Sequence, residues 1–119
     1  MTVQDIANDL VALCKAGDFD AAGQKYWADD VISIEAMPGD MAEVRGKDAV
    51  KGKGDWWSAN HEVHSSEVEG PYVNGDQFVV RFKMDLTVKA TGERNQMDEV
   101  GLYTVRDGKI VEERFFYAT

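Results

Sequence analysis

The chain has 119 residues, 44% of them apolar and 29% charged, and a formal net charge of −9 at neutral pH. This length is enough for one domain, spanning residues 1–119, with a core that needs no disulfide or metal. The acidic charge argues against nucleic acid or an anionic membrane surface as a partner.

No apolar run approaches the ~20 residues of a membrane span, and the N-terminus lacks the basic-then-apolar pattern of a secretion signal. We therefore expect a cytoplasmic protein that does not enter a membrane. Cys14 is the sole cysteine, so no disulfide can form within the chain. Its place on an apolar helical stripe favours a buried small hydrophobe over a nucleophile.

Three helices are expected in the first 60 residues. Apolar residues recur at helical spacing over 3–16, and Gly17 ends that pattern. Asp18 is a suitable N-cap for a second, short helix that reaches about residue 27. The third, 46–59, contains two weakening glycines but carries enough apolar surface to lie on a sheet.

Strands make up most of the remaining chain. The first is expected over 31–36, and three hairpin signals of Asn-Gly, Thr-Gly or Asp-Gly type separate further strands after residue 61. Between the first two signals, apolar and mostly polar residues alternate strictly over 78–89, which is typical of an antiparallel strand buried on one face. Long strands near 75–89 and 94–106 should curve the sheet strongly.

This order predicts an α+β fold in which a strongly curved antiparallel sheet wraps around the N-terminal helices. Because the helices cover only the concave face, the sheet should form a cone with a pocket at its mouth. The sequence contains no repeat, low-complexity segment or linker.

Glu35 is the first candidate for chemistry, because it ends the expected strand on the same face as Val31 and Ser33. A carboxylate inside an apolar cup is a potential general base, since burial raises its pKa toward neutrality. The alternative is that Glu35 ends an edge strand and points into water.

The chain resembles the nuclear transport factor 2-like superfamily, nearest to SnoaL-like polyketide cyclases and ketosteroid isomerases. The resemblance covers nearly the whole chain and rests on four motifs in order, namely AGDFD (16–20), YWADDV (26–31), RGKDAV (45–50) and VRDGKIV (105–111). It implies a cystatin-like α+β cone and places the ketosteroid isomerase general base at Glu35. The oxyanion-binding tyrosine and acid of that family would fall at Leu10 and near Gly101, which cannot donate a hydrogen bond from a side chain.

Glu99 is the second candidate. It should share the concave face with Met97, Gly101 and Tyr103, where an acid must be paired, protonated or near the mouth. It would act as a general acid beside Glu35, or pair with a neighbouring cation.

His64 is a third candidate, as a proton shuttle if it turns inward; the alternative is a surface or hydrogen-bonded structural histidine. His61 and His64 do not predict a metal site, because a spacing of three in a strand sends the two rings to opposite faces. No further cysteine or histidine outside this pair and Cys14 is present to complete a zinc site.

The aromatic residues should divide between core and pocket. Tyr26 and Trp57 are the better candidates for presenting a polar tip to a ligand, and in the family register Phe115 and Tyr117 line the cone. Arg114 then lies on the convex face within a cross-strand charge ladder, a face that packs against a second copy in this superfamily. A bulge would instead turn Arg114 into the pocket.

We hypothesise a cofactor-independent isomerase, cyclase or dehydratase that removes a proton next to the carbonyl of a small, mostly apolar molecule. Glu35 would be the base, and Glu99, His64 or Tyr26 would bind the oxyanion or return the proton. Motifs for phosphate, dinucleotide or nucleophile-elbow chemistry are absent, which argues against a cofactor. The alternatives are a non-catalytic pocket for an apolar ligand and a dimeric interaction module whose cone is filled with side chains.

Overall fold

The computed structural model describes residues 1–118. These residues form three helices and six strands. The helices are α1 (Val3–Lys15), α2 (Phe19–Tyr26) and α3 (Lys47–Asn60). The strands are β1 (Trp27–Ile34), β2 (Glu43–Arg45), β3 (His61–Asn74), β4 (Gln77–Val88), β5 (Glu93–Arg106) and β6 (Lys109–Phe116).

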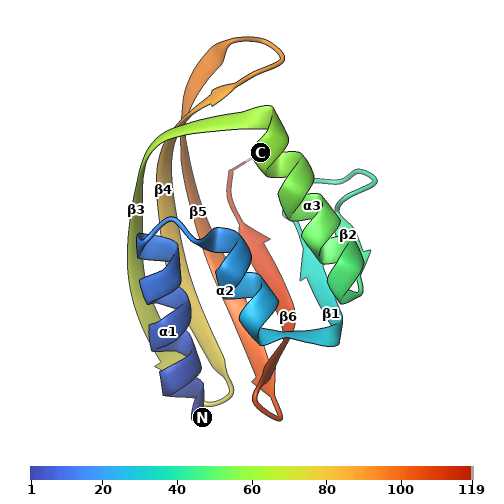
Figure 1. Cartoon of the computed structure of the whole chain (residues 1–119), viewed down its shortest axis with the longest axis vertical. Helices are drawn as coiled ribbons and strands as arrows, with labels where there is room; N and C mark the ends of the chain where they lie inside the picture. Colours follow the sequence, from blue (N-terminus) through green and yellow to red (C-terminus); the bar gives the residue numbers. More distant parts are fainter. Residues whose placement is uncertain (119) are drawn as a thin grey trace.

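The strands form one curved sheet in the order β2-β1-β6-β5-β4-β3, and the three helices lie along its concave side (Figure 1). The predicted α+β class is therefore confirmed. Two details differ from the prediction. β1 and β6 pair in parallel, and the short strand β2 adds an edge next to β1. The parallel pairing joins strands about 80 residues apart and leaves no local pattern in the sequence, which is why it could not be predicted.

The first helix begins with a capping box. The Thr2 hydroxyl accepts a hydrogen bond from the Asp5 amide at 3.1 Å, and the Asp5 carboxylate accepts one from the Thr2 amide at 3.0 Å. The apolar stripe of α1, with Ile6, Leu10 and Cys14, is buried against the sheet. Cys14 is thus a core residue, as expected, and burial raises the pKa of its thiol to about 12.

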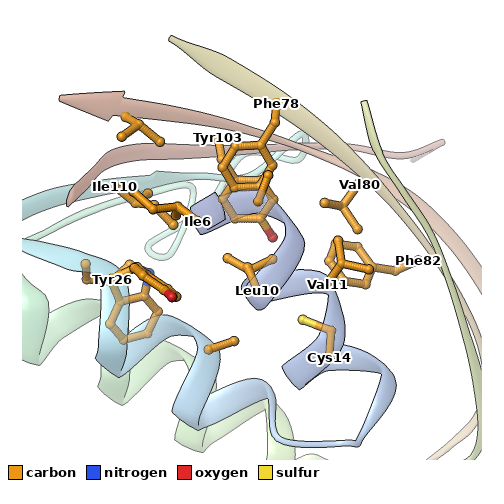
Figure 2. Packing of buried hydrophobic residues seen from close by; sticks show 14 of the residues in the cluster. Ile6, Leu10, Val11, Cys14, Tyr26, Phe78, Val80, Phe82, Tyr103 and Ile110 are labelled. Carbon is orange, nitrogen blue, oxygen red and sulfur yellow. The ribbon is translucent and has the colours of Figure 1, made fainter. Parts of the chain in front are cut away.

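The alternating pattern of β4 lies as predicted, with its apolar residues buried on the concave face. Phe78 of β4 stacks on Tyr103 of β5 with ring centroids 4.9 Å apart, and both rings lie between the sheet and α1 (Figure 2). This packing fixes the concave face of β5, from which the candidate site is built.

The convex face carries ion pairs across neighbouring strands. Arg81 binds Asp98 through two hydrogen bonds of 2.6 and 2.9 Å, and Arg94 binds Asp85 in the same way at 2.7 and 2.9 Å. Arg114 is half-exposed and lies 3.9 Å from Glu112, outside the cavity described below. The described residues contain no helix long and apolar enough to cross a membrane.

Candidate active site

An open cavity of about 1220 Å³ lies between the helices and the concave face of the sheet. Seven of the nine candidate residues line it together, namely Glu35, Trp57, Met97, Glu99, Tyr103, Phe115 and Tyr117. They come from the end of β1, from α3, and from β5, β6 and the residue that follows β6. A cavity of this size argues against a cone filled with side chains.

The remaining two candidates, Tyr26 and His64, lie outside the cavity, so these two assignments are corrected. Tyr26, the last residue of α2, is buried and donates its hydroxyl hydrogen bond to Asp9 of α1. His64 is exposed on β3, with Nε2 2.7 Å from the Thr87 hydroxyl. As the strand spacing predicted, His61 lies on the opposite side, where it lines the cavity and stacks on Trp57 at 4.5 Å.

Glu35 follows β1 directly and has both carboxylate oxygens engaged. Oε1 accepts a hydrogen bond from the Lys53 ammonium at 2.8 Å, and Oε2 accepts one from the Tyr117 hydroxyl at 3.0 Å. Burial, followed by this hydrogen bond, raises the pKa of Tyr117 to about 12, so Tyr117 keeps its proton at neutral pH. Glu35 therefore points into the cavity, as the sequence suggested, but as a member of an ion pair.

Lys53 is the centre of the polar network. Its side chain is only 12% exposed, and besides Glu35 it donates to the Ser33 hydroxyl at 2.6 Å. Its ammonium also lies 5.5 Å from the centre of the Phe115 ring. An ammonium has three donors, and these two hydrogen bonds use two of them, so one N–H is available to a ligand in the cavity.

Glu113 of β6 continues this network into the protein interior. It is 7% exposed and accepts hydrogen bonds from the Ser33 hydroxyl at 2.9 Å and from the Trp27 indole N–H at 3.2 Å. Burial raises the pKa of Glu113, and the two hydrogen bonds act in the opposite direction. Ser33 thus connects Lys53 to Glu113, because its hydroxyl accepts from one and donates to the other.

Sequence reasoning missed Lys53 and Glu113 as site residues, although weak signals for both were present. Glu113 alternates with Phe115 and Tyr117 and so faces the cone with them. Lys53 lies three residues after Val50 and four before Trp57, on the helix face that meets the sheet. A search for apolar positions does not register a lysine on the same helix face, which is why Lys53 was missed.

Glu99 of β5 differs from Glu35 and Glu113 because its carboxylate has no hydrogen-bond or ion-pair partner within residues 1–118. It is half-buried and lines the cavity. Burial raises the pKa of Glu99 to about 7; Glu35 and Glu113 act in the same direction and Lys53 in the opposite one. A carboxyl group with this pKa exchanges protons readily near neutral pH.

The Tyr103 ring leans back along β5 over Gly101. A Cβ atom at Gly101 would lie 2.9 to 3.2 Å from the outer ring atoms and hydroxyl of Tyr103, so the absence of a side chain there makes room for the ring. In the described part of the chain the Tyr103 hydroxyl has no hydrogen-bond partner, and burial raises its pKa further, which keeps it protonated. It is therefore a free donor on the same face of β5 as Glu99, with Gly101 between them.

The residues thus supply an acid or base with a near-neutral pKa and two donors, the third N–H of Lys53 and the hydroxyl of Tyr103. Such a set can move a proton and stabilise an oxyanion. Among residues 1–118 no group of three or more histidine, cysteine or acidic side chains is arranged to hold a metal ion.

Comparison with known proteins places this fold and cavity in a family. The family model described as SnoaL-like domain matches residues 1–117. A crystal structure from Mesorhizobium loti, provisionally named a SnoaL-like polyketide cyclase and also a carbohydrate phosphatase, is 62% identical in sequence. It aligns with 98% of this chain and 100% of its own, with a TM-score of 0.96. None of the curated proteins matches this chain.

More distant structures share the fold. A nuclear transport factor 2-like protein from Burkholderia xenovorans is 23% identical, with a TM-score of 0.77 over 96% of this chain and 87% of its own. A protein from Catenulispora acidiphila with a ketosteroid isomerase-like fold, solved with trimethylamine, is 19% identical, with a TM-score of 0.75 over 98% and 88%. The match over residues 1–117 and the 62% identical structure establish the family, and this chain belongs to the SnoaL-like domain family.

Proposed function

We propose that this SnoaL-like protein is a cofactor-independent enzyme that transfers a proton next to the carbonyl group of a small, mostly apolar molecule. The observation that carries the proposal is Glu99, a carboxyl group with a pKa of about 7 that faces the cavity without a partner among the described residues. Isomerisation, cyclisation and dehydration of a carbonyl compound all begin with this proton transfer.

In the proposed mechanism, ionised Glu99 removes the proton from the carbon next to the carbonyl. The C–H electron pair moves into the new C=C bond, and the carbonyl oxygen becomes an oxyanion. Lys53 and Tyr103 donate hydrogen bonds to that oxygen, and protonated Glu99 then returns the proton to a different atom of the substrate. Donors arranged before the reaction stabilise the oxyanion more than they stabilise the ground state.

The sequence assigned the base to Glu35, whereas we place it at Glu99. The two oxygens of Glu35 already accept hydrogen bonds from Lys53 and Tyr117, so a proton arriving there would have to displace one of them. Glu35 instead keeps the Lys53 ammonium in the cavity and, through its charge, raises the pKa of Glu99. Its role is that of a positioning residue.

Deuterium exchange tests this proposal without knowledge of the natural substrate. The protein is incubated in D2O with 2-tetralone or cyclohexanone, and NMR measures the loss of the proton next to the carbonyl. We expect exchange faster than in buffer, rising with pH through about 7 as Glu99 ionises. Glu99→Gln should slow it by about 10²-fold or more, since that is the usual contribution of a general base.

Glu67→Gln is the matched control, because Glu67 is exposed on β3 and does not line the cavity. This variant should exchange at the wild-type rate. Wild-type exchange in Glu99→Gln, with the fold intact by circular dichroism, would contradict the assignment of the base. Ketone binding with no exchange above buffer would favour the non-catalytic pocket.

A further inference from the structure

The lining of the cavity is strongly acidic. Glu35, Glu99 and Glu113 line it, and so do the exposed Asp20 and Asp40. Asp98 also lines it, but its charge is matched by Arg81 at 2.6 Å. Lys53 is the only lysine or arginine among the described residues that line it, and its charge is already matched by Glu35 at 2.8 Å. With Glu99 ionised, the cavity therefore carries unmatched negative charge.

The remaining walls of the cavity are rich in aromatic rings. Trp56 and Trp57 of α3 and Phe115 of β6 line it, as does the neutral Tyr117. An aromatic face attracts a cation through its quadrupole, and the Lys53 ammonium already lies 5.5 Å from the centre of the Phe115 ring. These rings favour a cation whose surface is apolar over a strongly hydrated one.

We infer that the ligand of this cavity carries a protonated amine or a quaternary ammonium group, held between the acidic side chains and the aromatic walls. This inference rests on the proposed function, because the ammonium group would belong to the same molecule as the reacting carbonyl. We expect anionic ligands, including phosphate esters and carboxylates, to bind poorly. The carboxylates of the lining would repel them, and Lys53 alone would offset that repulsion.

A cationic substrate also resolves an electrostatic difficulty of the proposed reaction. Proton removal creates an oxyanion in a cavity whose lining already includes Glu35, Glu99 and Glu113. The positive charge of the substrate itself then stabilises the oxyanion, in addition to Lys53. The same charge stabilises ionised Glu99 before the reaction.

Three molecules of similar shape and different charge test the inference. Choline is cationic, 3,3-dimethyl-1-butanol replaces its nitrogen with carbon and is neutral, and 3,3-dimethylbutanoate is anionic. Binding of each to the wild-type protein is measured at pH 8 by NMR titration. Choline should bind about tenfold or more tightly than the alcohol, as expected for a cation–π site with opposite charge. The carboxylate should bind most weakly.

The pH dependence and two variants identify the charges responsible. Glu99 faces Glu35, Lys53 and Glu113. The other titratable groups that line the cavity are Cys14, Asp20, Asp40, His61, Asp98, Tyr103 and Tyr117. At pH 5.5, where Glu99 is protonated, the preference for choline should fall. It should be smaller at pH 8 in Glu99→Gln and change little in the outer-face control Glu67→Gln. Any pH dependence left in Glu99→Gln belongs to the other groups.

Equal or tighter binding of the alcohol at pH 8 would overturn the inference and leave the deuterium-exchange result untouched. Conversely, a preference for choline in a protein that does not exchange ketone protons would support an ammonium-binding cavity and contradict the proposed catalysis. The wild-type comparison needs no variant, so a variant that fails to fold does not remove the test.

Discussion

At the scale of single residues, the site is a set of carboxyl groups with different surroundings. Glu35 is ion-paired, Glu113 is buried with two donors, and Glu99 is left without a partner within the described residues. Burial raises the pKa of both Glu99 and Glu113, but only Glu113 has hydrogen bonds that act in the opposite direction. Lys53 acts on all three, through a direct contact with Glu35 and through its charge on the others.

Opposite shifts in the pKa of Glu99 are expected from two substitutions. Glu35→Gln removes a negative neighbour and should lower that pKa from about 7 toward its ordinary value. Lys53→Met removes a positive neighbour and should raise it. NMR titration of carbon-13-labelled glutamate carboxyl groups measures both shifts. If both variants moved the pKa in the same direction, the charges of Glu35 and Lys53 would not be what controls Glu99.

At the scale of elements, β5 shows how one small residue shapes the site. Gly101 leaves space that the Tyr103 ring occupies, and the ring is held there by stacking on Phe78 of β4. The donor hydroxyl of Tyr103 is thus placed over Gly101 by packing, with no hydrogen bond to orient it in the described structure.

Gly101→Ala should destabilise the protein by about 1–3 kcal/mol, because the new methyl group overlaps a ring that is packed on both sides. The overlap depends on Tyr103, so the same substitution should be nearly neutral in a Tyr103→Ala background. Urea denaturation of the wild type, both single variants and the double variant forms a double-mutant cycle. Additive free energies of unfolding would show that the two residues do not interact.

The elements were largely predictable from sequence, whereas the pairing between them was not. The alternation in 78–89 and the helical stripe in 3–16 are local patterns, and both lie where they were expected. The parallel contact of β1 with β6 depends on residues distant in sequence, and so does the network of Ser33, Lys53 and Glu113. Tyr26 and His64 were predicted in the cavity but lie outside it, because their side chains point elsewhere. The Tyr26 hydroxyl binds Asp9, and the His64 ring lies near the Thr87 hydroxyl.

At the scale of the whole molecule, the stability of the protein should depend on pH through its buried acids. The pKa of Glu99 is higher in the folded state, so the folded protein binds the proton more tightly than the unfolded chain. The stability that this proton contributes is complete below the ordinary pKa of 4.5 and is lost as the pH rises to about 7.

Glu99→Gln should therefore change the free energy of unfolding, relative to wild type, more favourably at pH 8 than at pH 5. The difference between the two pH values should be on the order of 2–3 kcal/mol for a pKa shift of this size. The free energy of unfolding of wild type and variant, measured in urea at both pH values, checks the difference. Glu67→Gln should produce no such pH-dependent change. A variant equally affected at both pH values would indicate that Glu99 titrates as an ordinary carboxyl group.

The convex face of the sheet remains our candidate for contact with a second copy of the chain. It carries two exposed rings: Tyr72, which lies near Arg81, and Phe116, which shares a face of β6 with Arg114. We expect a homodimer by light scattering after size-exclusion chromatography, and a monomer for a Tyr72→Glu, Phe116→Glu double variant. A wild-type monomer at micromolar concentration would contradict this expectation.

The position of β6 in the sheet has a consequence for how the protein is made. β6 is the last strand in sequence, yet it lies between β1 and β5 and is the strand that joins the β1–β2 edge to the rest of the sheet. During synthesis, the edge of β1 opposite β2 has no strand to pair with until residues 109–116 have left the ribosome. Glu35 cannot meet Tyr117, nor Ser33 meet Glu113, before that moment. The site is therefore completed only when β6 pairs with both β1 and β5, in the same event that closes the sheet.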